Sequence, residues 1–158
     1  MNNIMKLCFS MILLAASSVP ALAAAPVELS SDVFVEKQTK QPDGSFSTVL
    51  AKPSMILPGD QLVFVVRYRN AGNKPATNFS VTNPIPAAIA FSGTSDGAEV
   101  VSIDGGKSWG KLSQLRVNNA DGSSRNALMT DVTHLKWQMN QMLGAGDAGK
   151  LIFRGVVK

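Results

Sequence analysis

Apolar and polar side chains alternate in several segments of the chain, with the period of two that is typical of β-strands. The clearest case is residues 61–70, where every second side chain from Leu62 to Tyr68 is apolar or aromatic. The opposite face there includes Gln61 and two arginines, so we expect a half-buried strand. Residues 78–82, 89–91, 133–139 and 151–157 repeat the pattern. Together these strands predict one core, made of Leu62, Phe64, Val66, Tyr68, Phe79, Val81, Phe91, Leu135, Trp137, Leu151 and Phe153.

Turn-forming sequences lie between these segments. Glycine supplies a positive φ, proline presets φ, and Asp or Asn side chains bond to their own backbone. Such residues occur at 42–44, 58–60, 71–73, 104–106, 121–122 and 144–146. Helical periodicity is confined to the N-terminal segment, and the chain contains no internal repeat. The pattern therefore predicts an all-β fold, an immunoglobulin-like antiparallel β-sandwich of about 7–9 strands without a disulfide.

The N-terminal 23 residues have the order of regions found in a secretory signal peptide. One cation, Lys6, precedes an apolar run over residues 7–16, and small residues follow up to Ala23. A run of about ten residues is too short to cross a hydrocarbon core of roughly 30 Å as a helix. We therefore expect cleavage after Ala23 and export to the periplasm or the cell exterior. Cys8 lies at the head of the apolar run, away from the cleavage site, so we expect no lipid anchor.

Cleavage would remove the only cysteine and leave about 135 residues, which suits one domain over residues 24–158. The leader carries Lys6 but no acidic residue, so the net charge falls from +4 to about +3. Cations cluster most closely at Arg67, Arg69 and Lys74, where apolar and turn residues interrupt them. We therefore expect no nucleic acid as partner and a solvated strand face instead. No later segment is apolar for long enough to suggest a membrane span.

Several of these segments, in order, resemble a known family. Residues 57–72 resemble the opening of a bacterial surface-protein repeat called domain of unknown function eleven, which has an immunoglobulin-like fold. Residues 76–86 resemble its second strand and the turn that follows, and residues 135–137 and 143–157 resemble its closing strands. Asn83 stands where the family usually has aspartate, and residues 92–131 form an inserted hairpin and loop. The resemblance implies structural roles for Pro58, Gly59, Asp60, Asn70, Gly72, Asn83, Pro86, Trp137 and Gly146.

Residues 102–109 fit the Asp-box pattern Ser-x-Asp-x-Gly-x-x-Trp, which is known as a hairpin turn in sialidases and similar propellers. Here the pattern is carried by Ser102, Asp104, Gly106 and Trp109. The aspartate can accept hydrogen bonds from turn amides, and the tryptophan can cover the base of the hairpin. Propellers repeat the box, whereas this chain has one copy. We therefore expect a structural turn and no role in sugar binding.

A copper site is the first alternative that the side chains leave open. Imidazole and thioether ligands suit copper, and the chain offers His134, Met139 and Met142 as weak candidates. Alternation places His134 on the strand face opposite to Met139, and methionine more often fills cores and loops. We therefore expect no metal and no cofactor.

The inventory for catalysis is small. The leader holds the only cysteine, His134 is the only histidine, and no nucleophile-elbow pattern surrounds a serine. No spacing singles out a pair of carboxylates, because the acidic residues fall mostly in turns. We therefore expect that the protein is not an enzyme.

These observations favour an exported binding or structural module of the cell envelope or surface that acts through protein contacts. Its partner would be another envelope or surface protein, bound by an edge strand or by the 92–131 insertion. The alternatives are a periplasmic copper-binding sandwich, a glycan-acting or glycan-binding protein, and an assembly chaperone that lends an edge strand. The oligomeric state stays open.

The leader generates the first prediction. The exported protein should begin at Ala24 and be soluble without a membrane, because the apolar run ends before a small-residue cleavage site. Intact-mass spectrometry of the exported form checks this. A mass that includes the leader, or an added lipid, would contradict it.

Overall fold

The computed structural model describes residues 27–95, 97 and 100–158, so the leader predicted for residues 1–23 lies outside the described part. These residues form ten β-strands and two short 3₁₀-helices, η1 and η2. No helix within them is long and apolar enough to cross a membrane. In chain order the elements are β1 Val27–Lys40, β2 Phe46–Ala51, β3 Gln61–Asn70, β4 Phe79–Pro84, β5 Ile89–Thr94, β6 Val100–Ser102, η1 Leu112–Gln114, β7 Arg116–Asn118, β8 Ser124–Asn126, η2 Met129–Asp131, β9 His134–Met139 and β10 Ala148–Val157.

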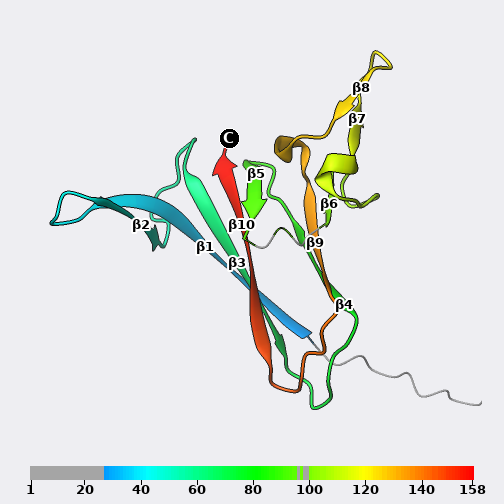
Figure 1. Cartoon of the computed structure of the whole chain (residues 1–158), viewed down its shortest axis with the longest axis horizontal. Coiled ribbons are helices and arrows are strands. Elements are labelled where there is room, and N and C mark those ends of the chain that lie inside the picture. The colour runs from blue at the N-terminus through cyan, green and yellow to red at the C-terminus, as the bar shows by residue number, and fades with distance from the viewer. Residues whose placement is uncertain (1–26, 96, 98–99) are drawn as a thin grey trace, which may run out of the picture.

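The strands form two main antiparallel sheets. The larger sheet has five strands in the order β2-β1-β3-β10-β5, and the smaller has three in the order β4-β9-β6. Strands β7 and β8 form a separate hairpin. In Figure 1 the long strands β1, β3 and β10 lie on one side and β4, β9 and β6 on the other. The predicted all-β antiparallel sandwich without a disulfide is confirmed, with ten strands in the described residues where about 7–9 were expected.

Aromatic side chains from both sheets join the two layers. Phe64 on β3 stacks on Phe153 of the neighbouring β10, with ring centroids 4.5 Å apart and planes 1° from parallel. Trp137 of the smaller sheet packs on Phe153 at 6.3 Å, and Tyr68 meets Phe79 edge-on at 5.9 Å. All eleven predicted core residues lie in this cluster, with Tyr68 and Phe79 only partly buried.

Strand β3 is buried on both faces from Leu62 to Val66, so the half-buried strand expected for residues 61–70 is correct only at its ends, where Gln61, Arg67 and Arg69 are exposed. Val63 and Val65 point away from the second sheet, yet they are only 1% and 6% exposed. Phe34 and Arg154 stand beside Val63 on the two neighbouring strands. The Arg154 side chain reaches across β3 to Glu36, with Nε 3.1 Å from Oε1. Long ion-paired side chains and Phe34 therefore cover the valines, in place of a third layer.

A buried asparagine ties two loops together at one end of the sandwich. The Asn70 side chain is fully buried and donates hydrogen bonds to the backbone oxygens of Lys74 and Leu143, at 2.8 and 3.0 Å. Its Oδ1 accepts from the Gly72 amide at 3.0 Å, and its backbone oxygen accepts from the Gly146 amide at 2.9 Å. The family-like residues Asn70, Gly72 and Gly146 thus act together in one structural cluster.

The remaining family-like residues also occupy turns or the core. Asp60 closes the turn before β3, because its carboxylate accepts from the Leu57 amide at 2.8 Å and its amide donates back to the Leu57 oxygen at 3.0 Å. The Asn83 side-chain amide donates to the Pro84 oxygen at 2.8 Å, a bond that an aspartate at this position could not make. The Pro86 oxygen accepts from the Ile89 amide at 2.8 Å and leads the chain into β5.

The alternation of apolar and polar residues did not predict strands β1 and β2. Residues 27–35 of β1 pair with β3, and residues 35–40 pair with β2, so Val35 alone has both neighbours. In Figure 1 the second half of β1 and all of β2 extend away from β3 and from the smaller sheet. We call residues 36–51 the arm.

The 92–131 segment is partly built into the sandwich. Its first residues complete β5, and β6 joins the smaller sheet beside β9. Beyond Ser102 the segment contains both 3₁₀-helices and the β7–β8 hairpin, which projects at the far end of the molecule from the arm (Figure 1). Arg125 and Asp131 hold its base through two hydrogen bonds of 2.6 and 2.7 Å.

The aromatic stack generates the second prediction. Phe64→Ala should lower the free energy of unfolding by about 2–5 kcal/mol, because it removes a ring packed between the sheets. Urea denaturation of both proteins measures this difference. The matched control is Phe46→Ala, since Phe46 is 68% exposed, and it should change stability by no more than about 0.5 kcal/mol. Equal effects of the two changes would contradict the strand register.

Candidate functional site

The arm is a two-stranded ribbon closed by a tight turn. The Gln41 amide donates to the Ser45 oxygen at 2.7 Å, and the Gly44 amide donates to the Gln41 oxygen at 3.0 Å. Gly44 has φ +83°, a conformation that glycine adopts without strain. Asp43 accepts from the Ser45 amide and hydroxyl, which keep the pKa of this carboxyl below its usual value. The turn is thus locally stable, as its Pro-Asp-Gly sequence predicted.

Large apolar side chains are exposed along β2 and the loop that follows. Six of the ten exposed large hydrophobic residues in the described chain fall within residues 46–57, which we call the apolar segment. They are Phe46 (68% exposed), Val49 (40%), Leu50 (51%), Met55 (72%), Ile56 (46%) and Leu57 (55%). Scattered exposed apolar residues are normal, but this many within twelve residues make the apolar segment the candidate interaction surface of the described chain, on both faces of β2 and along the loop that follows.

The other projecting element is polar. All the residues of β8 and the ends of β7 are exposed, and they are arginine, asparagine and serine. The Arg116 guanidinium bonds to Ser124 and to Asn126, at 3.0 and 3.2 Å, so its donors are used within the hairpin. The sequence predicted that either an edge strand or the 92–131 insertion makes the contact. Of these two, the edge strand β2, with its exposed apolar side chains, is therefore the stronger candidate.

The Asp box forms a self-contained turn. Asp104 accepts hydrogen bonds from the Lys107 amide at 3.1 Å and from the Ser108 amide and hydroxyl at 3.0 and 2.6 Å. The Ser102 hydroxyl donates to Asp104 at 2.7 Å and accepts from the Gly106 amide at 2.9 Å. These contacts, those of Ser108 first, lower the pKa of Asp104 well below its usual value. The carboxylate oxygens therefore already accept hydrogen bonds from residues of their own loop.

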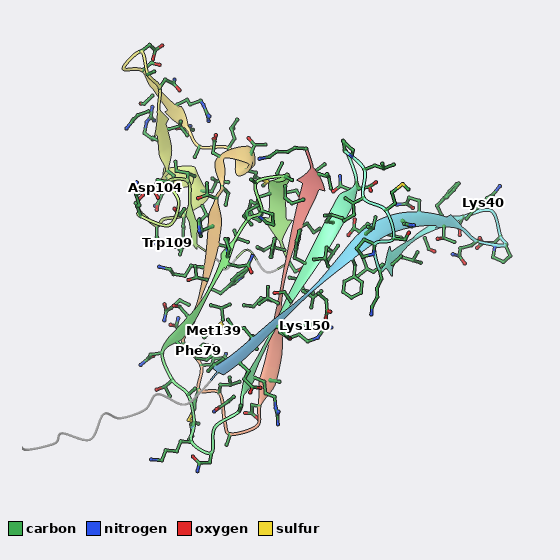
Figure 2. All side chains as sticks on the ribbon, turned by 180° about the vertical axis from the view of Figure 1, so that it is seen from behind. Lys40, Phe79, Asp104, Trp109, Met139 and Lys150 are labelled. Atoms are coloured by element: carbon green, nitrogen blue, oxygen red, sulfur yellow. The ribbon has the colours of Figure 1, made fainter. Side chains whose placement is uncertain are left out.

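Trp109 folds back over the outer face of the smaller sheet. The Lys136 ammonium lies 3.8 Å from the centre of its ring, and the His134 ring meets it edge-on at 6.3 Å. Gly106 lies under this pair, because a Cβ there would come within 3.7 Å of the Trp109 ring. Figure 2 shows Asp104 and Trp109 close together. The tryptophan therefore covers the base of the turn, as predicted, although only one bridge, Val101 to Gly110, continues the hairpin.

The copper candidates do not converge. His134 begins β9 and Met139 ends it, and Met139 packs partly buried against the core. Figure 2 shows the labelled Met139 well separated from Trp109, the neighbour of His134. Met142 is 67% exposed in the next loop. In the described residues no group of three or more His, Cys, Asp or Glu side chains is placed to hold a metal ion.

The Thr133 hydroxyl lies 3.1 Å from Nδ1 of His134. A base beside a hydroxyl can activate a nucleophile. However, the Thr133 hydroxyl donates to the Ser102 backbone oxygen at 3.0 Å and accepts from the Gly105 amide at 3.1 Å. Its proton is therefore directed to a carbonyl, and the geometry is that of a structural contact.

An open depression of about 700 Å³ lies where the β5 and β6 edges approach η1 and η2. Phe91, Val101, Leu112 and Met129 supply its apolar wall. Among the described residues that line it, Lys111 is the only titratable one. The depression therefore offers apolar contact but no pair of acid and base groups.

The chain was also compared with protein families, curated proteins and solved structures. No family model, curated protein or solved structure matches it. The resemblance to the surface-protein repeat therefore remains an expectation from the sequence.

The Asp box generates the third prediction. Asp104→Ala should lower the thermal midpoint, because five donor contacts from its own loop lose their acceptor. The pKa of Asp104 is depressed in the folded state, so its contribution is present above the unfolded pKa of about 4 and is lost as the pH falls further. The difference between wild type and variant should therefore shrink in acid. Thermal melts at several pH values measure this difference.

A sugar-binding role for the box makes the opposite forecast. In that case Asp104→Ala would abolish binding to a glycan array while leaving the thermal midpoint unchanged. Measuring binding and stability on the same variant separates the two. Lost binding with an unmoved midpoint would show that the turn is a functional site.

Proposed function

We propose that the protein is an exported, non-catalytic module of the cell envelope or surface that acts through protein contacts made by its arm and apolar segment. The observation that carries this proposal is the concentration of six exposed large apolar side chains within residues 46–57, on both faces of β2 and in the loop that follows it. A surface of this kind gains free energy when a partner removes it from water, by about 25 cal/mol per Å².

The shape of the arm supports the same conclusion. Residues 36–40 pair with β2 alone, so this part of the arm is a ribbon two strands wide. An isolated two-stranded ribbon is only marginally stable in water, and packing against further strands or another surface is what stabilises it. Because this ribbon also exposes Phe46 and Leu50, binding to a partner would stabilise it, whereas on its own it is only marginally stable.

The alternatives have weaker support. Copper binding would require His134 and Met139 to approach one another, and they occupy opposite ends of β9. Glycan binding through the Asp box would require a free carboxylate and an open indole face. Asp104 bonds within its loop, and the Lys136 ammonium lies over the Trp109 ring.

The fourth prediction tests the arm in the cell. A photo-reactive phenylalanine analogue in place of Phe46 should form a discrete protein adduct on irradiation, because this position is 68% exposed on the apolar surface. The same analogue in place of Ser124, on the exposed β8 strand, is the matched control and should form none. Gel electrophoresis and mass spectrometry measure both.

Competition makes the result specific. Excess unmodified protein should suppress the Phe46 adduct, and a Leu50→Asp/Met55→Asp competitor should not, because it lacks the apolar surface. Equal adducts from positions 46 and 124, or equal suppression by both competitors, would contradict the proposal.

A further inference from the structure

We propose that the partner of the arm is a second copy of this chain. In this arrangement the β2 strand of each copy pairs with the free edge of β1 in the other, and the two larger sheets become one continuous sheet around a two-fold axis. The inference rests on the proposed function, since it names what the arm binds.

The two edges involved are complementary in length. On the side of β1 that faces β2, residues 35–40 are paired, and residues 27–34 have no partner strand among the described residues. Strand β2 has six residues and forms the outer edge of the sheet. The unpaired stretch of β1 is thus two residues longer than the strand that would fill it. Unpaired edges of this kind are templates for strand addition.

Hydrogen bonds near the strand ends show which backbone groups face each edge. The Asn70 amide donates to the Asp147 oxygen, so Asn70 and the other even-numbered residues of β3 direct their backbone groups toward β10. The odd-numbered residues of β3 therefore face β1, and they are paired with its even-numbered residues, as Arg67 is with Ser30. It follows that Leu29, Ser31 and Val33 direct their backbone groups to the unpaired side.

The turn of the arm gives the same parity independently. The Gln41 amide donates to the Ser45 oxygen, so odd-numbered residues face across the ribbon on both β1 and β2. The even-numbered residues of β2 therefore direct their amides and carbonyls outward, away from β1. These residues are Phe46, Thr48 and Leu50.

A two-fold axis normal to the sheet brings these two sets of groups together. It places β2 of the second copy parallel to residues 27–34 of β1 and keeps every side chain on its own face of the sheet. With Ser31 beside Val49 of the second copy, the Ser31 amide would donate to the Thr48 oxygen, and the Leu50 amide would donate to the Ser31 oxygen. Such a contact is isologous and closes at two copies, which is the commonest symmetry of homo-oligomers.

Side chains at the two edges also complement one another. Leu29 is 53% exposed and lies on the same face as Val49, which is 40% exposed. Exposed Glu28 gives the unpaired edge an acidic side chain, and exposed Lys40 gives the arm a basic one, whereas Asp32 is ion-paired with Arg67 within the same copy. Glu28 and Lys40 share the outer face of the sheet. Opposite charges favour this docking, and the apolar pair is removed from water.

Proline substitutions at outward-facing amides test the pairing in the exported protein. Ser31→Pro and Thr48→Pro each remove one donor of the intermolecular ladder. Neither removes a donor of the ladder within a copy, because both amides point to an unpaired edge, and proline is tolerated on edge strands. Thr82→Pro is the matched control. The Ile85 amide donates to the Thr133 oxygen, so alternation directs the Thr82 amide to the free edge of β4. Sedimentation velocity should find two copies for wild type and Thr82→Pro, and one copy for Ser31→Pro and Thr48→Pro.

A disulfide tests the register directly, on a Cys8→Ser background. Ser31→Cys/Val49→Cys should form a disulfide between copies on mild oxidation, whereas Ser30→Cys/Val49→Cys should not, because residues 30 and 49 lie on opposite faces. Within one copy Val49 pairs with Lys37, six residues along β1 from Ser31. At about 3.3 Å per residue, the two positions lie far beyond the roughly 7 Å limit for a disulfide.

The outcomes separate this inference from the proposed function. A single copy at every concentration, or an association that Ser31→Pro and Thr48→Pro leave unchanged, overturns the second copy as partner. If the protein sediments as one copy and the Phe46 adduct contains a different envelope protein, the arm is still a binding element and only the inference fails. If the adduct has the mass of two chains and Ser31→Pro abolishes it, both stand. Circular dichroism and cooperative melting of each variant exclude misfolding as the cause.

Discussion

The architecture depends on how one long strand is shared between two neighbours. Strand β1 has fourteen residues, and its pairings with β3 and with β2 overlap only at Val35. Because each neighbour covers a different half, the strand must leave the sandwich where β3 begins. The same offset creates the arm at one end and an unpaired edge at the other. The exposed surface is therefore a consequence of backbone pairing, and the side chains along it determine what that surface can bind.

The body of the sandwich is stabilised mainly by contacts outside the arm, to which the arm contributes the Glu36 side chain. Phe64, Phe153 and Trp137 fix the distance between the two sheets, and Asn70 locks the loops at one end. Ion-paired Arg154 and Glu36 cover Val63 on the outer face. These contacts hold β3 and β10 in place, and the first half of β1 is held by its pairing with β3. The arm can therefore project with apolar side chains exposed while the fold remains intact.

The strength of the sequence pattern differed between the core and the arm for a physical reason. Alternation located β3, β9 and β10, because their apolar faces are buried against a second sheet and must be apolar at every second position. Strand β1 has few apolar positions, and Leu29 among them is exposed, so no such constraint marked it. The burial of Val63 depends on Arg154 and Glu36, which lie 118 residues apart, and a local pattern contains no information about such a contact. The Asp box was predictable because all its hydrogen-bond partners but one, Thr133, lie within seven residues.

The central claim is that the unpaired half of β1 is one side of an interface, and amide hydrogen exchange tests it most directly. The amides of Leu29, Ser31 and Val33 point to this edge, whereas those of Ser30 and Asp32 bond to β3. Residue-resolved exchange by NMR at high and low protein concentration compares the two sets. We predict that the odd-numbered amides exchange slowly at high concentration and freely on dilution, while the even-numbered amides stay protected at both. Free exchange of the odd-numbered amides at every concentration would contradict it.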